Sequence, residues 1–143
     1  MPTADKQALL EGLNTDLAHE YQAIVMYNSF AAMVSGIHRP ILKTFFEGEL
    51  PEELAHAQFL ADKITALGGK PTTAPAPLDL PDVPEEMLRA VLRAETETIK
   101  RYVERRKQAE AFEDYGLAAD LDGIISDETK HKEETEKLLR TLG

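Results

Sequence analysis

Residues 53–56 read Glu-Leu-Ala-His and residues 128–131 read Glu-Thr-Lys-His, so the motif Glu-x-x-His occurs twice in this chain of 143 residues. A further glutamate precedes each motif by 33 residues, at Glu20 and at Glu95. The sequence therefore contains two copies of one unit, and each unit supplies two glutamates and one histidine.

The spacing inside each motif is helical. Residues three apart share one face of a helix, whereas in a strand they would point to opposite sides. The glutamates also occupy places in apolar stripes whose steps alternate between three and four residues. The stripe on the first helix is Leu13, Leu17, Glu20, Ile24 and Tyr27. We therefore expect the glutamates to point into the core with the apolar residues.

The equal intervals predict two antiparallel helix pairs, because two such helices bring residues level when both lie equally far from the connecting turn. The midpoint of the first interval falls between Gly36 and Ile37, and the midpoint of the second falls at residues 111–112. We expect helices at about residues 4–35, 39–67, 84–112 and 115–142, with boundaries good to a few residues.

The stretch from Gly68 to Pro84 is rich in proline and is expected to be extended rather than helical. Its length suits a connection that crosses the whole bundle and joins the second helix to a parallel third helix. The predicted fold is therefore an all-α four-helix bundle, built from two antiparallel helix pairs joined by a long crossover.

The length and the 43% content of hydrophobic residues predict a single globular domain over residues 1–143. No run of about 18 apolar residues is present, so no membrane span is expected. We see no secretion signal at the N-terminus, and cysteine is absent. A cytoplasmic protein without disulfides fits these observations.

The formal net charge is −10, which does not favour a nucleic-acid binder. The short basic cluster at Lys100, Arg101 and residues 105–107 is expected to be a solvated helix face.

Four buried carboxylates would repel one another strongly, and two divalent cations would neutralise them. Oxygen and imidazole ligands without sulfur favour two iron ions per subunit, with manganese as the alternative and zinc still open. Glu53 and Glu128 would bridge the metals, while Glu20 and Glu95 would each be a terminal ligand. The predicted metal and catalytic residues are Glu20, Glu53, His56, Glu95, Glu128 and His131.

Other residues near the motifs have two interpretations each. Tyr27 and Tyr102 either pack in the core or support the ligands, and Asp127 could accept a hydrogen bond from a ligand histidine. Glu49 either is exposed or holds iron in transit. Pro51 predicts a kink or a break in the second helix. The two remaining histidines are expected at the surface: His19 and His38.

These residues give the chain a resemblance to bacterioferritins, from Leu9 to Gly143. The resemblance rests on residues 19–27, 53–56 and 127–131 together with Glu95. It implies a ferritin-like bundle whose di-iron ferroxidase centre oxidises Fe(II) with dioxygen or peroxide. It also implies homo-oligomeric shells that store the ferric mineral.

Three departures from the family pattern change these expectations. Leu54 stands where bacterioferritins carry the haem-binding methionine, so haem is not predicted. Gly48 stands where they carry a histidine of the inner-surface iron site. The sequence ends at Gly143, before the family's short fifth helix, which predicts a dimer or a shell of about twelve subunits rather than 24.

Two alternatives remain. A rubrerythrin-like protein would reduce peroxide without storing a mineral, but that family usually has a cysteine-ligated iron domain and a glutamate at the position of Thr98. A metal-free structural bundle would need basic residues facing the glutamates, and the sequence offers only Lys63 and Arg106 as marginal candidates.

Overall fold

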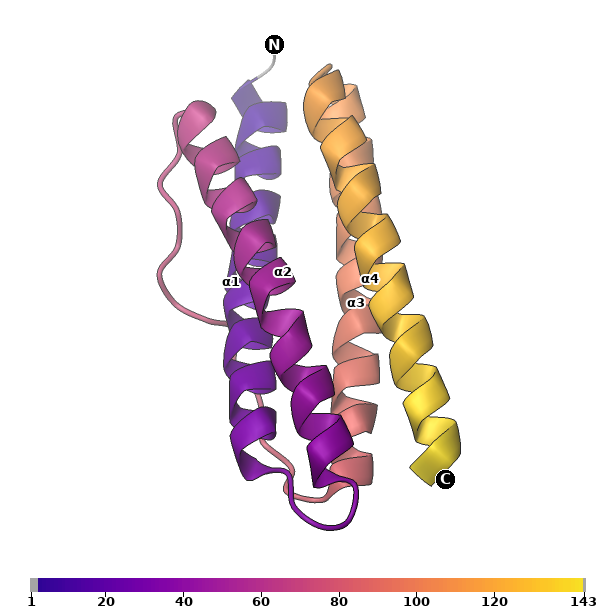
Figure 1. The fold of residues 1–143 in the computed structure, drawn as a ribbon. Coiled ribbons are helices and arrows are strands. Elements are labelled where there is room, and N and C mark those ends of the chain that lie inside the picture. Colours follow the sequence, from indigo (N-terminus) through magenta and orange to yellow (C-terminus); the bar gives the residue numbers. More distant parts are fainter. Residues whose placement is uncertain (1–2, 143) are drawn as a thin grey trace.

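The computed structural model describes residues 3–142, and this part of the chain contains four α-helices and no strand (Figure 1). No helix within it combines the length and the apolar character needed to cross a membrane. The all-α prediction is therefore confirmed, with helix ends within two residues of those expected. The helices are α1 (Thr3–Met33), α2 (Arg39–Ala66), α3 (Pro84–Ala111) and α4 (Tyr115–Leu142).

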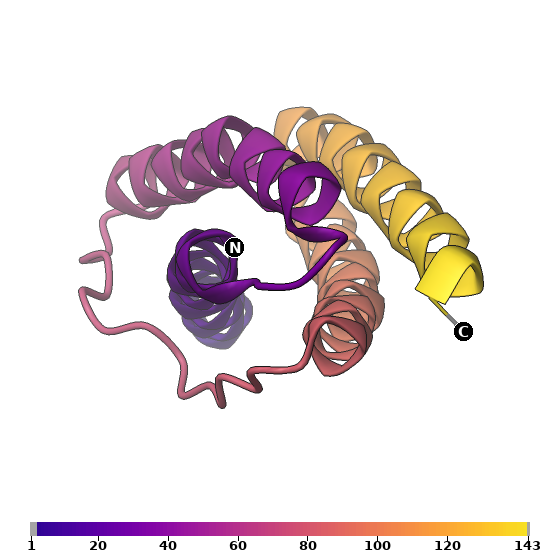
Figure 2. The ribbon, with the colours of Figure 1, turned by 60° about the horizontal axis from the view of Figure 1, so that its bottom comes forward.

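The helices form the two predicted antiparallel pairs. α1 packs against α2, and α3 packs against α4. The segment between α2 and α3 crosses the length of the bundle and makes these two helices parallel (Figure 1). The end-on view shows that this crossover runs around the outer side of α1 (Figure 2).

Glycine and proline residues set several helix ends. Gly36 has φ +91° in the turn after α1, and Gly68 has φ +88° in the turn after α2. Glycine adopts this left-handed conformation without a steric cost. Pro40 and Pro84 lie in the first turns of α2 and α3, where the missing N–H removes no helical hydrogen bond. α2 continues as one helix through Pro51.

Asp114 ties the start of α4 to α2. Its carboxylate accepts a hydrogen bond of 3.0 Å from the backbone N–H of Leu117, which caps the helix. The same carboxylate forms an ion pair with Lys63 of α2. Lys63 is therefore engaged near one end of the bundle and does not pair with a ligand glutamate.

The crossover is fastened along α1 by hydrogen bonds. The backbone N–H of Ala76 donates to the carbonyl of Ala18 at 2.9 Å. The Asn14 side chain donates to the carbonyl of Lys70 at 3.0 Å and accepts from the N–H of Thr72 at 2.8 Å. An extended segment has no internal hydrogen bonds, so these contacts with α1 fix its course.

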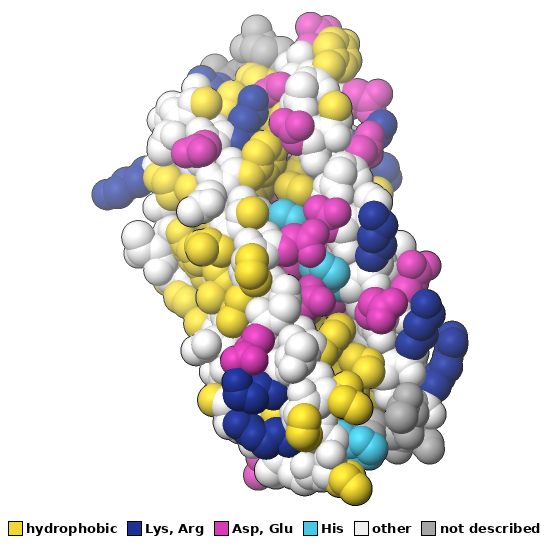
Figure 3. Space-filling model, in the orientation of Figure 1, with side chains coloured by type: hydrophobic (Ala, Val, Ile, Leu, Met, Phe, Trp, Pro, Cys, Tyr) yellow, Lys and Arg dark blue, Asp and Glu magenta, His cyan; other side chains and the backbone are white. Residues whose placement is uncertain are grey.

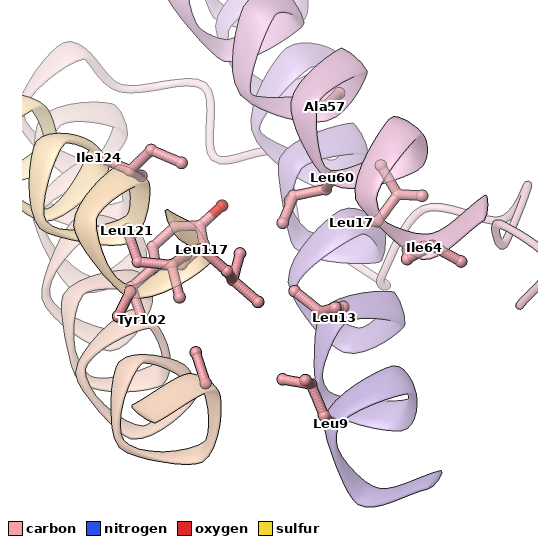
Figure 4. Packing of buried hydrophobic residues seen from close by; sticks show 12 residues of the cluster. Leu9, Leu13, Leu17, Ala57, Leu60, Ile64, Tyr102, Leu117, Leu121 and Ile124 are labelled. Atoms are coloured by element: carbon pink, nitrogen blue, oxygen red, sulfur yellow. The ribbon is translucent and has the colours of Figure 1, made fainter. Parts of the chain in front are cut away.

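The apolar core is divided into two clusters by a central layer of polar side chains. Figure 4 shows one cluster, in which residues such as Leu13 of α1 and Leu121 of α4 point toward one another. The other cluster contains Phe30 and Phe46, whose ring centroids lie 5.6 Å apart. The candidate metal centre lies in the layer between them.

Candidate metal centre

The six candidate ligands all come from this central layer. α1 and α3 each supply one glutamate, and α2 and α4 each supply a glutamate and a histidine one turn apart. All six side chains are buried, with no more than 8% of any residue exposed to solvent. The residues are Glu20, Glu53, His56, Glu95, Glu128 and His131.

Their ligand atoms form overlapping groups that share the motif glutamates. In the first group, atoms of Glu20, Glu53, His56 and Glu128 all lie within 4.8 Å of one another. The same limit holds for Glu95, Glu128 and His131, and separately for Glu49, Glu53 and His131. Glu53 and Glu128 therefore face both histidines, which is the arrangement that bridging carboxylates need.

Buried polar atoms without hydrogen-bond partners point into this space. They include Oε2 of Glu20, Oε1 of Glu53 and Oε1 of Glu128, together with Nδ1 of both motif histidines. Leaving one such group unsatisfied typically costs about 1–3 kcal/mol. Five such atoms in one layer could bind cations, because a metal ion accepts lone pairs from oxygen and from nitrogen.

The outer nitrogen of each histidine contacts an acid on the opposite helix pair. His56 Nε2 lies 3.4 Å from Asp127 Oδ2, which confirms the expected hydrogen bond. His131 Nε2 forms a hydrogen bond with Glu52 and lies 2.8 Å from Glu49 Oε2. An imidazole that donates its Nε2–H to a carboxylate keeps the Nδ1 lone pair free for a metal.

Glu49 and Glu52 are the neighbours of the centre that the sequence did not identify clearly. The side chain of Glu49 is only 13% exposed and lies beside His131, so the expectation of an exposed residue is wrong. Glu52 directly precedes Glu53 as Asp127 precedes Glu128. The internal repeat was therefore the signal that could have found it.

Hydroxyl groups support the two remaining glutamates, and the two tyrosines do so from the other hairpin. Tyr27 of α1 donates to Glu95 of α3 at 3.1 Å, and Tyr102 of α3 donates to Glu20 of α1 at 2.6 Å. The Thr135 hydroxyl lies 2.9 Å from the second oxygen of Glu95. Both tyrosines are thus buried supports of candidate ligands, which combines the two interpretations drawn from the sequence.

Burial and mutual repulsion favour protonation of two carboxyl groups in the metal-free protein. Burial raises the pKa of Glu53 well above its ordinary value, and the nearby charges of Glu20 and Glu128 add to this effect. Burial likewise raises the pKa of Glu95 to about 8, although the hydrogen bonds to that carboxyl oppose the shift. A cation that enters the centre must displace these protons.

The two motif histidines also favour the protonated form, which for an imidazole is the charged one. Burial opposes a charge on His56, but the nearby carboxylates of Glu128 and Glu20, 3.3 and 3.7 Å from Nδ1, outweigh it and raise the pKa of His56 to about 10. Burial also opposes a charge on His131, where the contact with Glu49 and neighbouring negative charges raise the pKa to about 9. In the absence of a cation, protons on both rings balance part of the negative charge of the layer.

Arg105 departs from its predicted place on a solvated helix face. It is only 7% exposed, and its guanidinium donates to both carboxylate oxygens of Asp16 on α1, at 2.7 and 3.1 Å. Arg105 follows Tyr102 by three residues, so it continues the inward face of α3. Asp16 lies one turn before Glu20, which places the ion pair beside the centre.

The basic residues do not neutralise the candidate ligands. Arg106 pairs with Asp122 and Glu110 at the surface, and Arg105 is taken by Asp16. Across residues 3–142, none of the four ligand glutamates forms an ion pair with a lysine or an arginine. The metal-free structural alternative therefore lacks the counter-charges that it requires.

Comparisons with known proteins agree with this geometry. Residues 10–143 match the family model of the ferritin-like domain. A ferritin-like di-iron-carboxylate protein from Bacillus anthracis is 49% identical, with a TM-score of 0.94 over 97% of this chain and 99% of that one. Rhodobacter capsulatus bacterioferritin is 25% identical, with a TM-score of 0.85 over 94% of this chain and 85% of that one.

A Dps protein from Bacillus brevis shares the fold at 24% identity, with a TM-score of 0.89 over 97% of this chain and 99% of that one. No curated protein is significantly similar in sequence to this chain. The predicted bundle of two helix pairs and one crossover is confirmed as the ferritin-like fold.

Proposed function

Since the chain belongs to the ferritin-like domain family, we propose that it is a ferroxidase, which oxidises Fe(II) to Fe(III) at a di-iron centre inside each subunit. Two Fe(II) ions would each lose one electron. Dioxygen would take both electrons and two protons to form hydrogen peroxide, or hydrogen peroxide would take them to form two waters.

The proposed ligand set follows the overlapping groups of ligand atoms in the central layer. Glu20 and His56 would hold one iron, and Glu95 and His131 would hold the other. Glu53 and Glu128 would bridge the pair, because each has ligand atoms within 4.8 Å of those of both motif histidines. When bound, the iron pair supplies the electrons for the reaction. The side chains of the protein position the two ions and balance their positive charge.

The observation that carries this proposal is the set of buried polar atoms without hydrogen-bond partners. Five oxygen and nitrogen atoms of the candidate ligands lack hydrogen-bond partners in a layer closed above and below by apolar clusters. Such an arrangement is costly without cations, and carboxylate with imidazole is a donor set that suits iron. The similarity to a di-iron-carboxylate protein at 49% identity supports the choice of metal.

The surrounding side chains would orient the ligands and handle protons. Tyr102 holds one oxygen of Glu20 and leaves the other without a hydrogen-bond partner, whereas Tyr27 and Thr135 hold the two oxygens of Glu95. Asp127 would hold the ring of His56, and Glu52 would hold the ring of His131, each with Nδ1 facing the metal site. Protons displaced from the histidines and from the raised-pKa carboxyls would leave as the cations bind.

Among ferritin-like proteins, we place this chain closest in role to the bacterioferritins, as its two Glu-x-x-His motifs suggest. We propose that it acts in iron detoxification and storage as a homo-oligomer, either a dimer or a shell of about twelve subunits. Haem is not part of this proposal, because Leu54 offers no ligand at the position used by that family.

The test separates binding from oxidation. Fe(II) is titrated anaerobically into the metal-free protein, and the loaded protein is then mixed with dioxygen or with peroxide while ferric absorbance is followed. We expect binding of two Fe(II) per chain and a fast oxidation phase. Glu128→Ala should remove that phase, whereas Glu133→Ala, an exposed glutamate on the same helix, should leave it intact.

A fast phase of unchanged rate and amplitude in Glu128→Ala would refute the ferroxidase proposal. Native mass after aerobic iron loading tests the storage part separately. Hundreds of irons in a large assembly would support storage. Retention of only two irons per chain would count against it and would favour peroxide reduction instead.

A further inference from the structure

A small cavity borders the candidate centre on the side where α1 and α3 meet. Its volume is about 10 Å³, close to the minimum that one water molecule needs. The cavity is lined by the four ligand glutamates and by residues of α1 and α3, namely His19, Ala23, Met26, Tyr27, Ala94 and Thr98. Ala23 and Ala94 are the smallest of these side chains, and they leave room for the cavity between the two helices.

Two larger hollows open at the surface of the same seam. One has a volume of about 330 Å³ and lies under Pro77 and Pro81 of the crossover. The other has a volume of about 250 Å³ and is bordered by His19, which is half-buried at the surface. Ala94 borders both hollows and the inner cavity, so its methyl group is the wall that all three share.

The charges on this seam are balanced. Arg93 and Arg101 border the hollows together with two acids, Asp79 and Glu97. The guanidinium groups disfavour the approach of a divalent cation, but they do not hinder a small uncharged molecule.

The opposite side of the centre, between α2 and α4, has a different character. Figure 3 shows histidine and acidic side chains gathered in the middle of that face. Glu52 and Asp127 are each more than one-third exposed there and contact the two ligand histidines. This face attracts cations, so the two sides of the centre suit different reactants.

We propose that the α1–α3 seam at Ala94 is the entrance by which the small uncharged oxidant, dioxygen or hydrogen peroxide, reaches the centre. This inference rests on the proposed ferroxidase function. Met26 borders the inner cavity and the larger hollow, and His19 borders the inner cavity and the second hollow, so fast fluctuations of these side chains beside Ala94 would join the spaces. Fe(II) is expected to use the acidic α2–α4 face.

The test enlarges the side chain at position 94, which borders all three spaces, and leaves the candidate ligands unchanged. In Ala94→Leu, the second-order rate constant for oxidation of Fe(II)-loaded protein should fall about tenfold with both oxidants. Ala90→Leu is the matched control, because Ala90 lies one turn earlier on α3 and borders only the outer hollow. It should react at the wild-type rate, since the second hollow stays open.

Two further measurements do not depend on turnover. Nitric oxide, an uncharged diatomic probe, should bind the Fe(II)-loaded Ala94→Leu protein about tenfold more slowly than the wild type. Anaerobic Co(II) titration should give the wild-type stoichiometry and affinity, which shows that the centre is intact. If Ala94→Leu does not fold, Ala23→Val on the opposite wall is expected to slow both reactions in the same direction.

The outcomes distinguish this inference from the proposed function. If the loaded wild-type protein does not react with either oxidant, the proposed function fails. If the wild type reacts and the filled variants react equally fast with dioxygen, peroxide and nitric oxide, only the entrance at Ala94 is refuted. Slowing with one oxidant alone would also overturn the inference, because both are assigned to the same seam.

Discussion

Replacement of Arg105 by methionine should destabilise the metal-free protein strongly at neutral pH. Asp16 is 2% exposed, and among the described residues its carboxylate receives side-chain hydrogen bonds only from the Arg105 guanidinium. Removing one partner of a buried ion pair typically costs about 3–5 kcal/mol, because the other charge stays buried without compensation. Domains of this kind are stable by only about 5–15 kcal/mol, so the loss should be plain in urea unfolding followed by circular dichroism.

The pH dependence of that loss provides a second check. Burial raises the pKa of Asp16 to about 6 even with Arg105 present, although the Arg105 bonds oppose the shift. Without Arg105, the folded-state pKa must rise further. A carboxyl with a raised folded-state pKa loses stability as pH rises from its unfolded value toward its folded value. The difference between wild type and Arg105→Met should therefore be smaller near pH 5 than at pH 8, and it should grow by up to about 1.4 kcal/mol per pH unit above pH 6.

Two further variants test the reasoning. Arg106→Met removes a neighbouring arginine whose pairs lie at the surface, and it should leave the unfolding midpoint unchanged. The double variant Asp16→Leu with Arg105→Met should recover most of the lost stability, since apolar replacements of a buried pair are often neutral. The argument fails if Arg105→Met unfolds at the wild-type midpoint at pH 7, or if the double variant is as unstable as the single one.

Three other predictions concern the centre and its neighbours. A redox-inert cation such as Zn(II), at 100 times its dissociation constant, should stabilise the fold by about 2.7 kcal/mol per independent site, measured by thermal melting with and without chelator. Affinity for Co(II) should rise between pH 6 and pH 8, because His131 (pKa about 9) and Glu95 (pKa about 8) must release protons when the cation binds. Calorimetry in buffers of different ionisation enthalpy should show this proton release. An affinity that does not change with pH would contradict the prediction. Gly12→Ala should destabilise the protein by about 1–3 kcal/mol, since the added Cβ would lie 1.9 Å from the Arg105 guanidinium. Gly123→Ala, at an exposed helical site with nothing within 4 Å, should instead stabilise it by about 0.5–1 kcal/mol in the same denaturation assay.

The fold could be predicted because the sequence features that indicate it are local and occur twice along the chain. Helical spacing, two equal intervals and one proline-rich segment were enough to give four helices, their pairing and the crossover. The convergence of the candidate ligands followed from the same pattern, since a glutamate in an apolar stripe points where its apolar neighbours point. Helix ends differed by one or two residues, where turns such as that at Gly36 set the boundary.

Features that depend on contacts between distant segments were not predictable in this way. Arg105 belongs to a run of basic residues that resembles a solvated surface, and its burial depends on Asp16, 89 residues earlier in the chain. It also depends on the absence of a side chain at Gly12, over which the guanidinium lies. Glu49 was likewise expected to be exposed. It is mostly buried because it lies beside His131, which comes from another helix.

Most supporting contacts of the centre run between the two hairpins; the Thr135 hydroxyl on α4, which donates to Glu95 of its own hairpin, is an exception. Each hairpin lends a tyrosine to the other's terminal glutamate and an acid to the other's histidine. A single hairpin in isolation would keep its three ligands but lose the tyrosine and acid contacts that orient them, and would be a poor chelator. Two identical hairpins related by a two-fold axis would satisfy the same tyrosine and acid contacts, so the complete centre needs two such units but not two different ones.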